Sequence, residues 1–158
     1  ADGQPRLHLS DSVPAGEGQL SLAGLARELA GFPGRKLVLI DAGFDGGARS
    51  VRGGAATPGS DDLAAFSQDP SFRIVVAAEA GQHALVFESL RHGLFTYHLL
   101  RGLSGAADED RDGRIAIAEL FGYVRDRVEA DAGYSGEGQS PRQVGAASVV
   151  FEPKKTGN

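Results

Sequence analysis

The sequence predicts an α/β domain with a mainly parallel sheet flanked by helices. Two short apolar runs, residues 37–42 and 72–78, are continuous rather than alternating. Such runs are typical of neighbouring central strands that are covered on both faces. Segments with helical spacing of apolar residues alternate with them along the chain. Binding residues in such sheets lie at the carboxyl ends of the strands, where Gly43 and Ala78-Glu79 fall.

Spacing and turn residues predict the other elements. Ser21 precedes a helical apolar pattern and is the expected N-cap. A stretch rich in Gly, Ser, Asp and Pro indicates a long surface loop. In chain order, the expected elements are a strand at 6–10, a helix at 21–30, a loop at 50–71, helices at 92–103 and 117–130, a glycine-rich loop at 133–140 and a strand at 146–151.

Composition fits one folded domain and argues against nucleic acid as a partner. The chain has 158 residues, of which 41% are hydrophobic and 23% charged. With a net charge of −5 and no basic cluster beyond Lys154-Lys155, we expect no nucleic-acid partner. The apolar runs are too short to span a membrane. There is no Cys, which excludes thiol chemistry and leaves the redox compartment open. We expect a soluble protein and favour the cytoplasm.

The stretch from Lys36 to Gly47 carries a family resemblance. An apolar run ends in Asp41, small residues and a double glycine. It resembles the nucleophile strand of caspase-like (caspase and metacaspase-type) cysteine peptidases, which usually reads Asp-Ala-Cys-Phe-Ser-Gly. Gly43 stands where those proteins have the cysteine. Residues 73–78, the motif Gly93-Leu94-Phe95-Thr96-Tyr97 and Ser140-Pro141 are similar to the segments that follow in bacterial members.

The resemblance implies that residues 1–158 form a single caspase-like domain, its C-terminal portion, with the front part of the fold missing. Strand 37–42 would then present an open edge to the N-terminal part of the fold, to a second copy or to another protein or peptide partner. By resemblance, the catalytic His of the family stands in a His-Gly turn at the end of a strand. His92 precedes Gly93 but is expected to open a helix, and His8, His83 and His98 do not precede a glycine, so we expect surface or packing roles for all four.

Three functions follow. Glycine cannot form the thiolate that attacks a peptide carbonyl, so the chain is expected to be an inactive pseudopeptidase that acts as a binding or regulatory module. Alternatively, it is an Arg/Lys-directed cysteine endopeptidase whose nucleophile is replaced at Gly43 and whose catalytic His lies outside the sequence. The third alternative is a calcium-responsive structural module. Asp41 has two interpretations: by resemblance it lines a pocket for a cationic side chain, or it bonds backbone amides at the turn.

Residues 108–119 reproduce the twelve-residue pattern of an EF-hand calcium loop. Asp108, Asp110 and Asp112 stand at positions one, three and five, Gly113 at six, Arg114 at seven, Ile115 at eight and Glu119 at twelve. This pattern predicts three carboxylate ligands, a sharp turn, a backbone carbonyl ligand from Arg114 and a bidentate ligand at the end. The alternative is an acidic turn that caps the next helix. Because the loop has no paired partner, we expect weak Ca²⁺ binding, on the order of 10⁻⁴ M, with Mg²⁺ possible.

Overall fold

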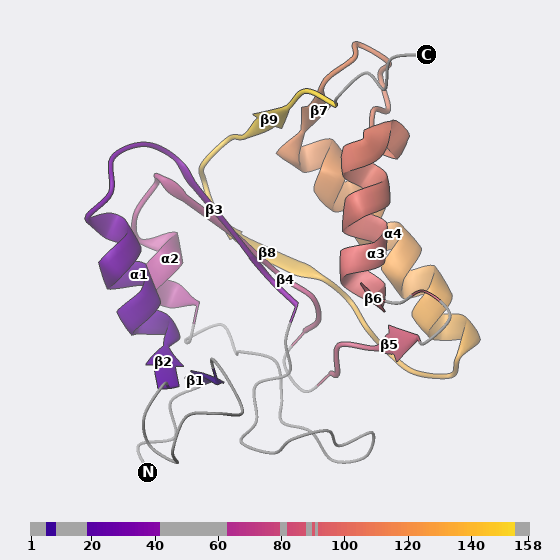
Figure 1. The fold of residues 1–158 in the computed structure, drawn as a ribbon, viewed down its shortest axis with the longest axis horizontal. Helices are drawn as coiled ribbons and strands as arrows, with labels where there is room; N and C mark the ends of the chain where they lie inside the picture. The colour runs from indigo at the N-terminus through magenta and orange to yellow at the C-terminus, as the bar shows by residue number, and fades with distance from the viewer. Residues whose placement is uncertain are drawn as a thin grey trace.

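The computed structural model describes residues 6–8, 19–41, 63–79, 82–87, 90 and 92–153. In this part of the chain a small sheet lies between two groups of helices (Figure 1). The described strands are β1 (Arg6–His8), β2 (Gln19–Ser21), β3 (Lys36–Ile40), β4 (Phe72–Val76), β5 (Val86–Phe87), β6 (His92–Gly93), β7 (Ile115–Ala116), β8 (Arg142–Gly145) and β9 (Val150–Phe151). The described helices are α1 (Leu22–Ala30), α2 (Ala64–Ser67), α3 (Leu94–Arg101) and α4 (Ile117–Tyr134), and a π-helical turn, Gly102–Ala106, continues α3.

The largest sheet has the order β3-β4-β8. Side chains of β4 alternate between its two faces. Ile74 and Val76 pack against α1 and α2. Val75 packs on the opposite face, in the cluster formed with α3 and α4. The continuous apolar run at 72–78 is therefore explained by burial on both faces, as predicted.

Strand β3 departs from the prediction that it is central. It pairs in parallel with β4, Val38 opposite Ile74, but the described part of the chain contains no strand on its other edge. Leu39 is 38% exposed, beside an apolar hollow against α3 and α4. An apolar run alone could not tell an edge strand from a central one. The expected occupant of this edge stays a prediction.

The sheet is mixed rather than mainly parallel. Strand β8 runs antiparallel to β4, with Val75 opposite Gln143. Among the described strands, β3 with β4 is the one parallel pair, and the pairs β1–β2, β5–β6 and β7–β9 are antiparallel. The α/β class is confirmed, and the parallel character was overestimated because β8 was not predicted.

Several element boundaries differ from the expected ones. The expected loop at 50–71 contains α2, because Phe66 is buried and packs edge-on against Phe72, with ring centroids 5.4 Å apart. The helix expected from residue 92 begins at Leu94, since His92 and Gly93 pair with β5. The strand expected at 146–151 is confined to β9, and the preceding strand β8 ends at Gly145, whose φ of 91° breaks the ladder.

The helical predictions otherwise agree with the structure. The Oγ of Ser21 accepts a hydrogen bond from the backbone N–H of Gly24 at 3.0 Å, which caps α1 as expected. Helix α4 is longer than predicted, and its buried stripe follows the helical spacing of Leu120, Val124 and Val128. In the part of the chain that the structure describes, no helix combines the length and apolarity needed to cross a bilayer.

Candidate functional site: the acidic loop and the carboxyl edge of the sheet

The acidic loop, residues 107–114, connects the π-helical turn to β7 and α4. Gly113 has a φ of 83°, so the sharp turn expected at position six of the pattern is present. Arg111 also has a positive φ, 62°, which is uncommon for a residue with a side chain. Two of three consecutive residues, 111 and 113, thus have a left-handed backbone conformation within this short loop.

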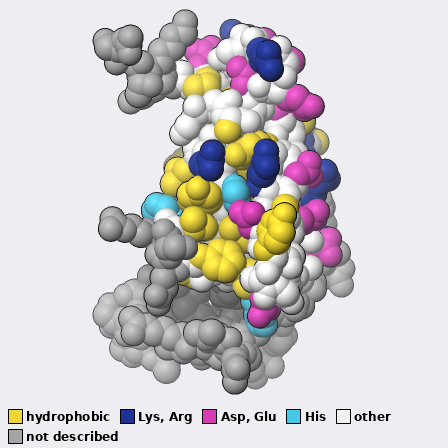
Figure 2. All heavy atoms as spheres, turned by 90° about the vertical axis from the view of Figure 1, so that its right-hand side faces the viewer, with side chains coloured by type: hydrophobic (Ala, Val, Ile, Leu, Met, Phe, Trp, Pro, Cys, Tyr) yellow, Lys and Arg dark blue, Asp and Glu magenta, His cyan; other side chains and the backbone are white. Residues whose placement is uncertain are grey.

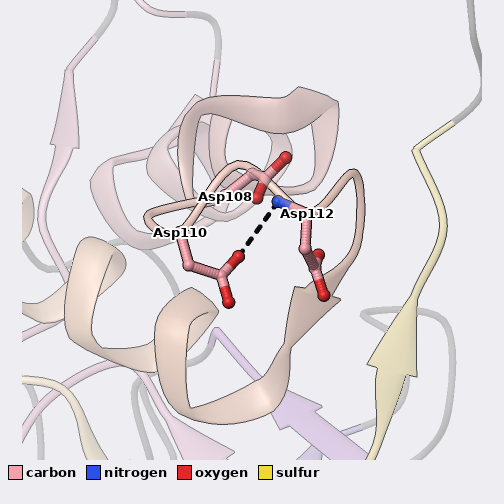
Figure 3. Close-up of side chains that lie close together, drawn as sticks. All are labelled: Asp108, Asp110 and Asp112. Carbon is pink, nitrogen blue, oxygen red and sulfur yellow. Dashed lines mark hydrogen bonds between the residues drawn. The ribbon is translucent and has the colours of Figure 1, made fainter.

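Three carboxylates converge inside this loop. One oxygen each from Asp108, Asp110 and Asp112 lies within 4.8 Å of the others (Figure 3). Backbone N–H groups hold the carboxylates in place: Gly113 donates to Asp108 Oδ2 at 3.1 Å, Asp112 to Asp110 Oδ1 at 3.1 Å, and Arg114 to Asp112 Oδ1 at 2.7 Å. The three aspartates that the sequence singled out are thus brought together.

Asp108 differs from its two neighbours because it is partly buried while Asp110 and Asp112 are exposed. Its Oδ1 is buried and has no hydrogen-bond partner among the described residues. A buried carboxylate oxygen without a donor is unfavourable, at about 1–3 kcal/mol or more for a charged group. The local structure therefore leaves one acceptor of the loop unsatisfied.

Glu119 and Arg114, the other expected ligands, occupy different positions. Glu119 lies on the first turn of α4 and is not part of the cluster of three aspartates. Its Oε2 accepts from the N–H of Ala116 at 2.7 Å, and its Oε1 accepts from the N–H of Glu109 at 3.2 Å. The contact with Ala116 is the half of a capping box in which the glutamate side chain bonds the backbone N–H of the N-cap residue. The contact with Glu109 also ties the same side chain to the start of the loop. The Arg114 side chain pairs with Glu152 at 3.5 Å, and a ligand role for its carbonyl stays a prediction.

The C-terminal strand β9 pairs with β7, the strand that directly follows the acidic loop. Ile115 pairs with Phe151 and Ala116 with Val150, and the N–H of Ile117 donates to the carbonyl of Val149 at 2.8 Å. Ile115 is fully buried, as expected for the apolar anchor of the pattern. The sequence contains no second loop of this kind to pair with the acidic loop. In the structure, β9 provides the strand contact instead.

The carboxyl edge of the sheet contains Asp41, directly after β3. Its Oδ2 accepts from the Thr96 N–H at 3.2 Å and from the Thr96 hydroxyl at 2.5 Å. Gly93 precedes α3 without a capping side chain, and a Cβ there would lie 2.5 Å from Asp41 Oδ2. Asp41 therefore caps α3 from another element. The amide that it bonds belongs to α3 and not to the turn after β3, whose residues lie outside the described part of the chain, and a pocket role for Asp41 stays a prediction. Gly43 lies outside the described residues.

Gln139 is a second polar residue at this edge, and sequence reasoning missed it. The side chain is buried, its Oε1 accepts from the Leu85 N–H at 2.8 Å, and its Nε2 donates to the Ala77 carbonyl at 2.9 Å. It joins the end of β4 to the segment before β5. A glutamine inside a glycine-rich stretch looks exposed in sequence, so no local pattern could have revealed this role.

The histidines have the expected roles where the structure describes their side chains. His98 is buried, its ring lies between Tyr97 and Tyr123, and its Nε2 is 2.8 Å from Asp131 Oδ2. His83 and His92 are exposed. The side chain of His8 lies outside the described part of the chain.

Comparisons of the chain with protein-family models, with curated proteins and with solved structures give no match. The fold and the geometry define an α/β protein with a cluster of three carboxylates, one partly buried and two exposed, in the loop between two helical segments. Such a cluster of oxygen ligands is suited to a hard cation.

Proposed function

We propose that the chain is a calcium-responsive structural module whose acidic loop binds one Ca²⁺. The observation that supports this most strongly is the unpaired, buried Oδ1 of Asp108 beside two further carboxylates. A divalent cation supplies positive charge to all three carboxylates at once. The residues that would hold it are Asp108, Asp110, Asp112 and Glu119, with the carbonyl of Arg114.

The donor set favours calcium over softer metals. All the side-chain ligands are carboxylates, and the chain has no Cys. Ca²⁺ accepts six to eight oxygens in flexible geometry, whereas Mg²⁺ requires a nearly ideal octahedron. Glu119 already accepts two backbone N–H groups, so joining the ligand set would require it to give up part of its capping role. This competition is consistent with weak affinity, on the order of 10⁻⁴ M.

The consequence of binding is structural. The acidic loop begins at the end of the π-helical turn that continues α3, and it is followed directly by β7, which pairs with β9, and then by α4. A cation shared by Asp108 at the start of this loop and Glu119 on α4 links the two helices through the loop. We therefore expect calcium to stabilise the helical layer and its contact with the C-terminal strand.

Calorimetric titration of the whole chain tests this proposal. We expect one Ca²⁺ per chain, weaker binding of Mg²⁺, and loss of at least about tenfold in affinity for Asp112→Asn. The matched control is Glu109→Gln, which removes a negative charge from the same loop at a position outside the pattern of ligands. Equal losses of calcium affinity for both variants, or no heat of binding at millimolar calcium, would show that the loop is a helix-capping turn and not a calcium site.

A caspase-like pseudopeptidase is the second candidate. The parallel pair β3–β4, with helices on both faces and Asp41 at the carboxyl end of β3, is compatible with the resemblance. In this function the chain binds a protein or peptide without cleaving it, since it has no cysteine to form the thioester intermediate of a cysteine peptidase. The pure chain should release no fluorophore from peptides ending in Arg, Lys or Asp, with or without calcium. Measurable turnover would contradict both proposals of an inactive module.

A further inference from the structure

Helices α3 and α4 present an unusual concentration of aromatic and basic side chains outside the acidic loop. The chain has three tyrosines, and all of them lie on these two helices, Tyr97 on α3 and Tyr123 and Tyr134 on α4. Viewed from the side of α3 and α4, the molecule shows basic side chains among hydrophobic ones, with histidine between them (Figure 2). We call Tyr97, Leu100, Arg101, Tyr123, Arg127 and Tyr134 the tyrosine–arginine face.

Helical spacing explains why these residues are neighbours. Tyr97 and Arg101 are four residues apart on α3, as are Tyr123 and Arg127 on α4. The Arg101 guanidinium lies 5.8 Å from the centroid of the Tyr97 ring, and Arg127 lies 5.7 Å from that of Tyr123. The ring of His98 lies between the two tyrosines, with centroids 5.0 Å from Tyr97 and 6.5 Å from Tyr123. The face is therefore a row of edge-to-face ring contacts, with an arginine over the tyrosine at each end, that runs from one helix to the other.

The two arginines on this face are not neutralised by acidic side chains. Among the described residues, neither Arg101 nor Arg127 is within salt-bridge distance of a carboxylate, although acidic residues outnumber basic ones in the chain as a whole. Asp131, four residues after Arg127 on α4, is bonded to His98. Arg125, on another side of α4, is by contrast paired with Asp126 at 2.9 Å. Arg101 donates one hydrogen bond to the Tyr97 hydroxyl at 3.2 Å, and each guanidinium has further N–H groups that can donate to a carboxylate from outside.

The apolar part of the face is also exposed. Leu100 is 47% exposed and Tyr134 is 91% exposed. Tyrosine and arginine are the side chains most often found at the energetic centre of protein interfaces, because they offer large contact areas with few rotatable bonds or with planar hydrogen-bond donors. A partly exposed aromatic surface beside two guanidinium groups that have no carboxylate partner among the described residues therefore matches a segment that combines apolar and acidic side chains.

We infer that the tyrosine–arginine face docks an acidic segment of a partner protein, whose carboxylates pair with Arg101 and Arg127 and whose apolar side chains lie on Tyr97 and Tyr123. This inference is independent of calcium binding, because it uses none of the loop's carboxylates.

The probe is a fluorescein-labelled peptide in which glutamates alternate with leucines, and its binding is followed by fluorescence anisotropy in about 0.1 M salt. We expect saturable binding that is weakened about tenfold by the double substitution Arg101→Gln and Arg127→Gln, and weakened also by Tyr123→Ala. Arg125→Gln is the matched control, since it removes a charge that also lies over an aromatic ring on α4. It should change the affinity by less than about twofold. Thermal unfolding of each variant verifies that it folds.

Four outcomes would overturn the inference. Absence of saturable binding by the unmodified chain is the first. Equal binding of a peptide with glutamine in place of glutamate would remove the role of charge. An equal loss for Arg125→Gln would show that net charge, not this face, governs binding. Finally, binding to phosphatidylserine vesicles that depends on the arginine pair, without peptide binding, would assign the face to a membrane surface instead.

Discussion

The carboxyl edge of the sheet and the acidic loop both contain charged or polar side chains, but the hydrogen-bond partners of these side chains differ. At the edge, Asp41 and Gln139 are bonded to groups of other elements, namely Thr96 for the first and Leu85 and Ala77 for the second. In the loop, each aspartate receives a backbone N–H on one oxygen, and Oδ1 of Asp108 stays buried and unpaired. Polar groups that are paired within the chain stabilise the fold, whereas the unpaired Oδ1 of Asp108, beside two further carboxylates, still has the capacity to accept from water or an ion.

Gln139→Leu should have the largest effect of the substitutions that probe this contrast. It keeps the side-chain size but leaves the Leu85 N–H and the Ala77 carbonyl without their partner. We expect a loss of about 3 kcal/mol in the free energy of unfolding, measured by urea denaturation. Gln68→Leu, at an exposed position after α2, is the control and should change stability by no more than about 0.5 kcal/mol. A small loss for Gln139→Leu would mean that the edge is solvated.

Asp41→Ala should have an intermediate effect. Loss of the cap on α3 should lower the free energy of unfolding by about 1–2 kcal/mol, and calcium should not alter this loss. Gly93→Ala should destabilise the same contact, because its Cβ would collide with the Asp41 carboxylate. The double substitution should then cost clearly less than the sum of the two. Strict additivity would show that Asp41 and Gly93 do not act through one contact.

Asp108→Asn should have the smallest effect without calcium, and of opposite sign. An amide can still accept from the Gly113 N–H, while the unpaired charged oxygen is removed. In chelator we expect stability to rise by roughly 0.5 kcal/mol, the magnitude of an interaction between partly exposed charges. Thermal unfolding in EDTA measures this, with Glu109→Gln as a control of equal charge. A marked loss of stability would place Asp108 with Asp41, among the structural carboxylates.

Features that depend on neighbours in sequence could be predicted, and those that depend on distant ones could not. The cap at Ser21 and the convergence of Asp108, Asp110 and Asp112 follow from local spacing. The placement of β3 at an edge of the described sheet, the pairing of β9 with β7 and the burial of Gln139 depend on contacts between residues far apart in the chain. Glu119 shows the same limit, because its capping contacts with Ala116 and Glu109 compete with the ligand role that the pattern assigns to it.

Thermal unfolding with calcium and with chelator is the most direct test of the central claim, that the acidic loop is a calcium site. Calcium at a hundredfold excess over the dissociation constant should raise the free energy of unfolding by about 2.7 kcal/mol. Glu119→Gln should abolish most of this gain, and Glu109→Gln should retain it. About 10 mM calcium is a hundredfold above the dissociation constant expected here. If the melting curves of the unmodified chain at this concentration and in chelator superimpose, the account is contradicted.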